Sequence, residues 1–384
     1  MADKTNMWGP AAAEGGPSIL KRLLSLKDFE PAARRFLPRP IFGYVSGAAE
    51  DGRSKALAEQ AFDDWAFLPR VLKNVSQRTQ ATTLLGRDYA GPFGIAPMGL
   101  SAISAYRADI VMARAAAAAD IPFILSGSSL IRLEDVAEAA PGSWFQAYLP
   151  GEIARIDALL DRAEAAGYET LVVTVDVPVG GNRENLTRAG FSSPLKPSLR
   201  LAWDGAIRPR WIAQVMLPTL LRHGMPHFEN SFAERGAPIL SSKVERDFSA
   251  RDHFDWSHIA HIRRRWKGPL VLKGLIRADD TAKARAEGVD AVVVSNHAGR
   301  QMDGMLAPLH ALPAVAEAAG DMPVILDSGV RRGADVLKAL ALGASFVLVG
   351  RPMLYGAALG GQPGVAHAIA ILKGEIDRGL ALLG

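Results

Sequence analysis

The sequence contains no cysteine in its 384 residues. Disulfides, thiolate metal sites and cysteine nucleophiles are therefore excluded, and the composition fits a reducing compartment. No stretch approaches the ~20 consecutive apolar residues that a membrane-spanning helix needs. The opening residues MADKTNMWGP also lack the apolar core of a secretory signal. We therefore expect a cytoplasmic protein, with at most a peripheral contact on the inner face of the cell membrane.

An excess of charge of one sign is also absent, because 44 basic residues face 40 acidic ones and leave a net charge of +4. No block of lysine and arginine interleaved with aromatic residues is present, so we expect no nucleic-acid partner. We also expect no bound metal. Hydrophobic residues make up 49% of the chain, which allows a large core in one α/β domain or two smaller ones.

From residue 92 onward, short apolar runs alternate with alanine-rich helical stretches. The runs are continuous rather than alternating, which is typical of strands buried on both faces. Eight strand–helix units predict an α/β fold of the (β/α)8 TIM barrel type, with a doubly wound open sheet as the alternative. The eight runs are PFGIAPM, IPFILSG, SWFQAYL, ETLVVTVDVP, GPLVLKG, DAVVVSN, MPVILDSG and ASFVLVGRP.

The pattern predicts one barrel domain over residues 27–384, preceded by a flexible N-terminus at 1–26. Residues 27–65 read as a helical segment ahead of the barrel. An insertion of about residues 180–255 follows the fourth strand, and it is too long for an ordinary barrel loop.

Polar and ionisable side chains gather where the apolar runs stop. In TIM barrels the active site lies at the carboxyl ends of the strands. Any single residue there could simply cap a helix or face solvent, but the set as a whole predicts a catalytic site. Its members are Pro97, Met98, Gly99, Ser126, Gln146, Tyr148, Thr174, Asp176, Lys273, Ser295, His297, Asp327, Gly329, Gly350 and Arg351.

The last two strands are followed by the signature of a phosphate site. Glycines and arginines in DSGVRRG and VGRPM place backbone N–H groups and positive charge at helix starts, with Arg331 or Arg332 in the first motif. Lys273 ends another strand, and burying it unpaired is costly, so it meets a negative charge or loses its proton. It suits either a Schiff base or the stabilisation of an anionic ring.

Together, SNHAGRQMDG, DSGVRRG, LVGRP, VVTVD, VLKG and YVSGAAED resemble the FMN-dependent (S)-2-hydroxy acid oxidase and dehydrogenase family, which includes glycolate oxidase, lactate dehydrogenases and mandelate dehydrogenase. The resemblance runs from about residue 27 to the end, with the motifs in family order. It implies the TIM barrel inferred above on separate grounds, an FMN cofactor and a homotetramer.

The resemblance also implies roles for individual residues. His297 takes a proton from the substrate, Asp176 orients that histidine, and Lys273 lies beside the flavin. The carboxylate of the substrate is bound by Arg183 and Arg300. Tyr44 and Tyr148 contact the substrate, and Tyr148 counts with His297, Asp176 and Lys273 among the catalytic residues.

The FMN contacts implied by the resemblance come from most of the strand ends. They are Pro97, Met98, Gly99, Ser126, Gln146, Thr174, Lys273, Ser295, Asp327, Gly329, Arg331, Gly350 and Arg351. Two residues depart from the family pattern, namely Ala298 in place of glycine and Met302 in place of leucine. Ala298 requires a backbone conformation that tolerates Cβ.

The implied reaction is oxidation of an (S)-2-hydroxy acid to the 2-oxo acid. Hydride transfer and carbanion routes use the same residues. Electrons pass to a quinone or another acceptor, and the alternative is an oxidase that uses O₂ and forms hydrogen peroxide. A non-redox flavin- or phosphate-binding barrel and a Schiff-base aldolase are alternatives from other classes. Gly99 and the tail RPMLYGAALGGQPGV resemble mandelate dehydrogenases, so we expect a bulky, mandelate-like substrate.

The insertion is basic, because residues 185–225 carry six lysines and arginines against the single acid Asp204. An apolar helical face with a tryptophan and flanking arginines suits an anionic membrane surface, and the membrane-bound relatives carry their anchor in this loop. We therefore expect a peripheral membrane contact through residues 205–225, which would favour a quinone acceptor. A lid or an oligomer contact is the alternative. The predicted face comprises Trp211, Ile212, Val215, Met216, Thr219 and Leu220, with a kink at Pro218.

Overall fold

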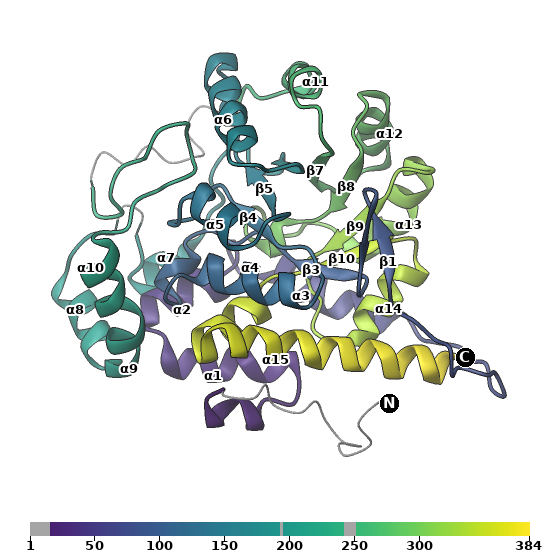
Figure 1. Ribbon diagram of the computed structural model, residues 1–384, viewed down its shortest axis with the longest axis horizontal. Coiled ribbons are helices and arrows are strands. Elements are labelled where there is room, and N and C mark those ends of the chain that lie inside the picture. The colour runs from purple at the N-terminus through teal and green to yellow at the C-terminus, as the bar shows by residue number, and fades with distance from the viewer. Residues whose placement is uncertain (1–15, 193–194, 242–250) are drawn as a thin grey trace.

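The computed structural model describes residues 16–192, 195–241 and 251–384. Eight parallel strands form a barrel in the order β3-β10-β9-β8-β7-β6-β5-β4. A parallel bridge between Ile95 and Phe123 joins the first and last strands of this order, so the sheet closes and the open-sheet alternative is wrong. The predicted TIM barrel is confirmed (Figure 1). The strands are β3 (Phe93–Ile95), β4 (Ile124–Ser126), β5 (Trp144–Ala147), β6 (Leu171–Thr174), β7 (Leu270–Leu275), β8 (Ala291–Val294), β9 (Val324–Asp327) and β10 (Phe346–Val349).

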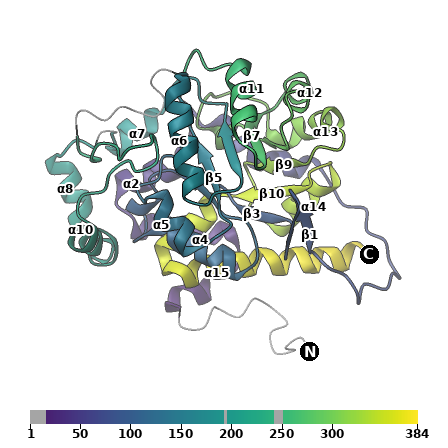
Figure 2. The same ribbon diagram turned by 45° about the horizontal axis from the view of Figure 1, so that its top comes forward.

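Helices surround the strands, and each strand is followed by one (Figure 2). Alanine-rich segments predominate in them because small side chains let a helix pack closely on the sheet. The final helix is long and bends where Gly360 and Gly361 leave helical geometry. The barrel helices are α4 (Ala108–Ala118), α5 (Leu133–Ala139), α6 (Ile153–Ala165), α11 (Trp256–Arg265), α12 (Ala278–Ala286), α13 (Pro308–Ala319), α14 (Gly333–Ala341) and α15 (Arg351–Leu383).

The continuous apolar runs serve two cores at once. Val172, Val271 and Ile325 belong to the cluster inside the barrel, whereas the neighbouring Val173 and Leu272 belong to the cluster between strands and helices. Successive side chains of a strand point to opposite faces, so nearly every position along these strands is buried, with Gly274 of β7 only partly so. This double burial is why the runs lack a polar alternation.

A hairpin that the sequence pattern did not predict contributes to the interior core. It pairs β1 (Thr82–Leu84) with β2 (Arg87–Tyr89). Leu84 and Tyr89 are buried in the interior cluster, and the Tyr89 ring lies 5.8 Å from that of Phe346, the first residue of β10. The hairpin therefore packs at the amino end of the barrel, away from the strand ends where the site was predicted.

The predicted helical segment before the barrel is present. It comprises α1 (Phe29–Phe36), α2 (Arg39–Ser46), α3 (Arg53–Gln60) and a 3-10 turn at Ala61–Asp64. Within the predicted flexible N-terminus, residues 1–15 lie outside the described part of the chain. Residues 18–28 instead form two 3-10 turns, Ser18–Arg22 and Leu26–Asp28, and their leucines are buried against the core.

The insertion lies between β6 and α11, as predicted, and its helices project to one side of the barrel in Figures 1 and 2. Residues 193–194 and 242–250 of it are outside the described chain. None of the helices in the described residues is long and apolar enough to cross a bilayer. The insertion contains α7 (Glu184–Ala189), α8 (Leu199–Ala206), α9 (Pro209–Trp211), a π-helical turn (Ile212–Met216) and α10 (Leu217–His223).

The prediction that six residues of this segment share one exposed face is wrong. Trp211 and Val215 are buried, and the Trp211 indole Nε1 donates to the Ile103 carbonyl at 2.9 Å. The π-helical turn ahead of Pro218 has a longer repeat than an α-helix, so it rotates the residues that follow. The exposed apolar side chains are instead Leu199, Trp203, Ile207, Met216, Leu217, Leu220, Leu221 and Met225, which we call the apolar rim.

Candidate active site

A pocket lies at the carboxyl ends of the barrel strands and gathers most of the predicted site residues. Four predicted residues are absent from its lining, namely Ser126, Gln146, Asp176 and Ser295, but their side chains are buried. Ser126, Asp176 and Ser295 are hydrogen-bonded to residues that line the pocket, and Gln146 is bonded to Ser126. The predicted residues that line it are Tyr44, Pro97, Met98, Gly99, Tyr148, Thr174, Arg183, Lys273, His297, Arg300, Asp327, Gly329, Arg331, Gly350 and Arg351.

His297, which follows β8, is held by Asp176, which follows β6. The histidine Nδ1 lies 2.9 Å from the Asp176 carboxylate oxygen Oδ1. An N–H at Nδ1 that donates to this carboxylate leaves the lone pair on Nε2, and Nε2 lies 3.5 Å from the Tyr148 hydroxyl. The pair therefore presents a proton acceptor beside the Tyr148 hydroxyl group at the pocket wall.

The electrostatics of the pair favour a neutral imidazole and an ionised carboxylate. Burial lowers the pKa of His297 below its ordinary value, although Asp176 opposes this shift. Burial alone would raise the pKa of Asp176, but the charge of His297 and its hydrogen bond reverse the effect and lower it. His297 is consequently able to accept a proton at neutral pH.

The backbone that carries His297 is left-handed over three residues. The φ angles of His297, Ala298 and Gly299 are 55°, 54° and 70°. Hydrogen bonds hold this turn, with the His297 N–H donating to Ser295 Oγ at 3.0 Å and the Ala298 N–H to Ser328 Oγ at 3.0 Å. The Cβ of Ala298 thus costs about 1 kcal/mol that a glycine would avoid.

Two arginines converge on the same pocket from different elements. The Arg183 Nε donates to the Arg300 carbonyl at 2.9 Å, and its guanidinium also contacts the Gln301 side chain. The Arg300 guanidinium donates to the Tyr44 carbonyl at 2.7 Å and lies over the Tyr44 ring. Burial, followed by repulsion from Arg183, lowers the pKa of Arg300 to about 10. A bound anion would relieve this unfavourable pairing of buried positive charges.

Lys273 lies in a buried network that crosses three adjacent strands. Its ammonium group is 2.8 Å from an Asp327 carboxylate oxygen and 3.0 Å from Ser295 Oγ. Burial would lower the pKa of Lys273, but Asp327 and Asp176 raise it overall. A protonated lysine is not a nucleophile, so the geometry disfavours the Schiff-base aldolase alternative.

One of the residues predicted to hold FMN leaves a polar group unpaired within the described part of the chain. Ser126 donates to the side-chain oxygen of Gln146 at 3.1 Å, and the Gln146 amide nitrogen is buried without a hydrogen-bond partner among the described residues. Such an unsatisfied donor is costly and fits a ligand heteroatom. Gly329 has φ +85°, and a Cβ there would lie 2.0 Å from the Ala58 carbonyl oxygen. Gly329 therefore lets the α3 backbone approach closely, and the unpaired Gln146 amide fits a polar cofactor.

The predicted phosphate arginines occupy the far end of the same wall. Arg331 forms an ion pair with Glu59 at 2.8 Å, and Arg351 donates to the Val45 and Gly47 carbonyls at 3.0 and 2.9 Å. Burial and the neighbouring Arg300 lower the pKa of Arg351 to about 10. This accumulation of positive charge suits a phosphate group.

Sequence reasoning missed several residues at the site. Leu186, Phe191 and Phe228 line the pocket and come from the insertion. Arg251 is buried, stacks over the Tyr148 ring at 5.3 Å and donates to the Thr174 carbonyl at 2.7 Å. These residues follow no strand end, so the rule that located the others could not find them.

Residues 33–384 match the model of the FMN-dependent dehydrogenases. The chain belongs to that family. It is 37% identical to the (S)-mandelate dehydrogenase of Pseudomonas putida, over 95% of this chain and 91% of the relative. It is 41% identical to an L-lactate dehydrogenase of Caulobacter vibrioides (strain NA1000 / CB15N), over 94% of both chains.

Solved structures agree with the sequence relatives. A crystal structure of the monotopic membrane protein (S)-mandelate dehydrogenase has a TM-score of 0.85 and 36% identity, covering 94% of this chain and 95% of that one. A mandelate oxidase structure has a TM-score of 0.78 and 32% identity, with 94% of each chain covered. The predicted FMN dependence and the oxidation of 2-hydroxy acids by this family member are thus confirmed.

Proposed function

We propose that this family member is a dehydrogenase for (S)-2-hydroxy acids with a bulky, mandelate-like side chain. The observation that carries the proposal is an apolar wall in the pocket, formed by Tyr44, Leu186, Phe191 and Phe228, which pack in one cluster. The rings of Tyr44 and Phe191 lie 4.8 Å apart. Such a surface gains free energy from an aromatic or long aliphatic group and gains little from a methyl group.

Gly99 supports a large substrate for a steric reason. A Cβ at this position would lie 2.9 Å from the Ser128 Cβ and 3.3 Å from the Tyr44 hydroxyl. An alanine would therefore crowd the boundary between the cofactor wall and the apolar wall. The glycine leaves that boundary open.

The polar residues divide the chemistry among themselves. Arg183 and Arg300 bind the substrate carboxylate, which places the hydroxyl and the α-hydrogen near His297. His297 Nε2 takes one proton, which comes from the hydroxyl in the hydride route and from the α-carbon in the carbanion route. Asp176 stabilises the imidazolium that forms. The Tyr148 hydroxyl, 3.5 Å from Nε2, positions the oxygen of the substrate.

FMN, when bound, would accept the two electrons of the oxidation and the hydrogen that His297 does not take. Lys273, kept protonated by Asp327 and Asp176, stabilises negative charge at the cofactor wall. The Gln146 amide and the backbone from Pro97 to Gly99 would hold the ring system, with Ser126, Thr174 and Ser295 completing the wall. Gly329, Arg331, Gly350 and Arg351 would hold the phosphate end.

Steady-state kinetics with glycolate, L-lactate, (S)-2-hydroxyoctanoate and (S)-mandelate test the substrate class. We expect the highest kcat/KM for mandelate or hydroxyoctanoate, at least about tenfold above glycolate, because a few buried methylene equivalents already give that ratio. The artificial acceptor is the same in every assay, so only the substrate varies. A maximum at glycolate or lactate would contradict the proposal.

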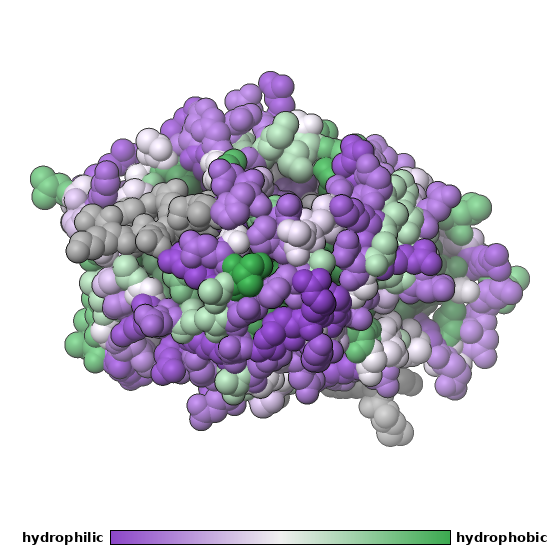
Figure 3. Space-filling model, turned by 90° about the horizontal axis from the view of Figure 1, so that it is seen from above, coloured by the Kyte–Doolittle hydropathy of each residue, from purple (hydrophilic) through white to green (hydrophobic). Residues whose placement is uncertain are grey.

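The apolar rim supports a peripheral membrane contact and hence a quinone as the electron acceptor. Leu199, Trp203 and Leu221 are 93%, 67% and 75% exposed. Figure 3 shows hydrophobic side chains along the left edge, where α8 and α10 lie in Figure 1. Exposed Arg200, Arg210 and Arg222 flank them, and they would face anionic headgroups. The homotetramer remains a prediction of the resemblance.

Vesicle flotation tests this contact. We expect the protein to float with vesicles containing phosphatidylglycerol, and the double substitution Trp203→Ser, Leu221→Ser to reduce the bound fraction about tenfold or more, because two large apolar groups are lost. Leu68→Ser, at a site that is 94% exposed on another part of the chain, is the control and should bind normally. A wild-type protein that ignores the vesicles and turns over rapidly with O₂ alone would favour the oxidase alternative.

A further inference from the structure

Phe228 reaches the apolar wall from the return segment of the insertion, residues 226–239, rather than from a barrel strand. It is buried and lines the pocket. It packs in one cluster with Leu100 and Phe191, which lie next to Gly99 and over Tyr44 respectively. The Phe228 ring thus belongs to the apolar part of the pocket lining, together with Tyr44 and Phe191.

The backbone around Phe228 is fixed on both sides. Its N–H donates to the Ala237 carbonyl at 3.2 Å, and its own carbonyl accepts from the Gly236 N–H at 2.8 Å. The next N–H, of Glu229, donates to the Ser129 carbonyl at 3.2 Å, in the loop after β4. A Cβ on Gly236 would lie 2.5 Å from the Phe228 carbonyl oxygen, so only glycine allows this approach.

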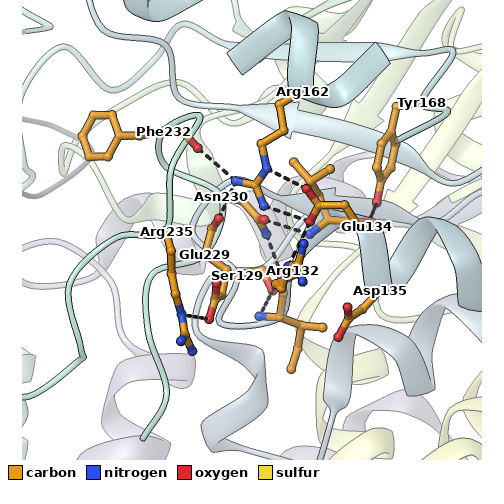
Figure 4. Close-up of polar contacts among 12 residues, drawn as sticks. Ser129, Arg132, Glu134, Asp135, Arg162, Tyr168, Glu229, Asn230, Phe232 and Arg235 are labelled. Carbon is orange, nitrogen blue, oxygen red and sulfur yellow. Dashed lines mark hydrogen bonds and ion pairs between the residues drawn. The ribbon is translucent and has the colours of Figure 1, made fainter. Parts of the chain in front are cut away.

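A cluster of polar side chains holds the same segment on the barrel helices (Figure 4). The buried Asn230 side chain accepts from the Leu133 N–H at 2.9 Å and donates to the Ile131 carbonyl at 2.7 Å, so it is tied to the start of α5. Arg162 on α6 donates to the Glu229 and Phe232 carbonyls at 2.7 and 3.0 Å.

Arg162 is itself oriented by a bidentate ion pair. Its Nε and one terminal nitrogen contact the two Glu134 carboxylate oxygens at 2.8 and 2.9 Å. Burial would raise the pKa of Glu134, but the bond to Arg162 lowers it, so the pair is charged. Because two guanidinium nitrogens of Arg162 are paired with both carboxylate oxygens of Glu134, the planar guanidinium is held in a single orientation. The segment that carries Phe228 is therefore fixed in place without touching the reacting atoms.

We propose that Phe228 determines specificity by contacting the substrate side chain, and that Asn230 and Arg162 are positioning residues that keep its ring at the pocket. This inference rests on the proposed function and assigns its apolar selectivity to one residue. The chemistry predicts a preference for aryl or long alkyl groups, because a ring edge or face offers contact area but no hydrogen bond.

The test compares Phe228→Ala with Phe232→Ala, both in otherwise intact, FMN-loaded protein. Figure 4 shows the Phe232 ring turned away from the cluster, and it lies under the Arg155 guanidinium at 4.8 Å. We expect Phe228→Ala to lower kcat/KM for (S)-mandelate about tenfold or more, a loss typical of a vacated apolar subsite. The same substitution should change kcat/KM for L-lactate less than about threefold. Phe232→Ala should leave kcat/KM for both acids unchanged.

Ligand titration gives a reading that does not depend on turnover. Phenylacetate and acetate carry the carboxylate but no hydroxyl, so each binds without reaction, and the flavin absorbance reports the Kd. We expect Phe228→Ala to raise the Kd of phenylacetate at least about tenfold and to leave the Kd of acetate nearly unchanged. Equal changes for both ligands, or a wild-type protein that binds phenylacetate no more tightly than acetate, would overturn the assignment.

Asn230→Ala tests the positioning role. We expect it to raise KM for mandelate more than for lactate while kcat stays within about threefold, and Asn230→Asp to recover part of the loss because it keeps the acceptor for the Leu133 N–H. Equal losses for both acids would show a merely structural role. If the wild-type flavin is reduced by lactate but by no bulky acid, the proposed substrate class fails, and the two titrations still decide the role of Phe228.

Discussion

Replacing His297 with glutamine is expected to leave FMN bound and to reduce the rate of flavin reduction by about 10²- to 10⁴-fold, the usual effect of losing a general base. Glutamine has similar length, but its amide cannot accept the proton that the proposed mechanism transfers to His297 Nε2. Anaerobic stopped-flow mixing with (S)-mandelate measures the rate directly.

The control for this variant is substrate binding. Phenylacetate should bind His297→Gln with nearly the wild-type Kd, since Arg183 and Arg300 are intact. Retained flavin absorbance shows that the cofactor wall around Lys273 is undisturbed. A variant that reduced its flavin within a few-fold of the wild-type rate would remove His297 from the proposed mechanism.

Replacing Arg300 with methionine is expected to raise KM for (S)-mandelate about 100-fold or more, because the proposed buried, charge-assisted contact to the substrate carboxylate would be lost. Some loss of kcat follows, since the carboxylate also orients the hydroxyl toward His297. The substitution removes the hydrogen bonds to the Tyr44 and Gly47 carbonyls as well. Steady-state kinetics at saturating acceptor separate KM from kcat.

Arg300→Lys is the matched variant, because it keeps the charge but loses the planar fork. We expect its KM to lie between those of the wild type and Arg300→Met. Thermal unfolding of all three proteins shows whether the α2 end, where the Arg300 guanidinium is bound, has loosened. An unchanged KM in Arg300→Met at wild-type stability would mean that the substrate carboxylate binds elsewhere.

Much of the site could be predicted because barrel geometry converts sequence position into spatial position. Lys273 lies near the carboxyl end of β7, two residues before the strand ends, whereas Ser295 follows β8 and Asp327 ends β9. These strands are neighbours in the barrel, so the three side chains meet. The same rule brought His297 and Asp176 together across one intervening strand. Continuous apolar runs predicted the strands themselves because both faces of a closed sheet are buried.

The other residues of the site, and the exposed face of the insertion, depend on how the insertion folds. The rule that site residues lie at the carboxyl ends of barrel strands does not describe that folding. Phe228 reaches the pocket only through its pairing with Gly236 and the contacts of Asn230 and Arg162, which are set by tertiary structure. Trp211 and Val215 are buried by tertiary contacts, such as the hydrogen bond from the Trp211 indole to the Ile103 carbonyl, which a helical repeat does not reveal. The apolar rim includes residues of α8 as well as of α10, so its composition also depends on how the insertion packs.

The central claim is that a neutral His297, oriented by Asp176, takes a proton from a bulky (S)-2-hydroxy acid. Anaerobic reduction of the bound flavin by (S)-mandelate, measured as a function of pH, tests it most directly. Protonated His297 cannot accept a proton, so the rate should fall at acidic pH, and because burial lowers the pKa of His297 the midpoint should lie below 6.5. A flavin that mandelate does not reduce, or a midpoint above 6.5, would contradict the account.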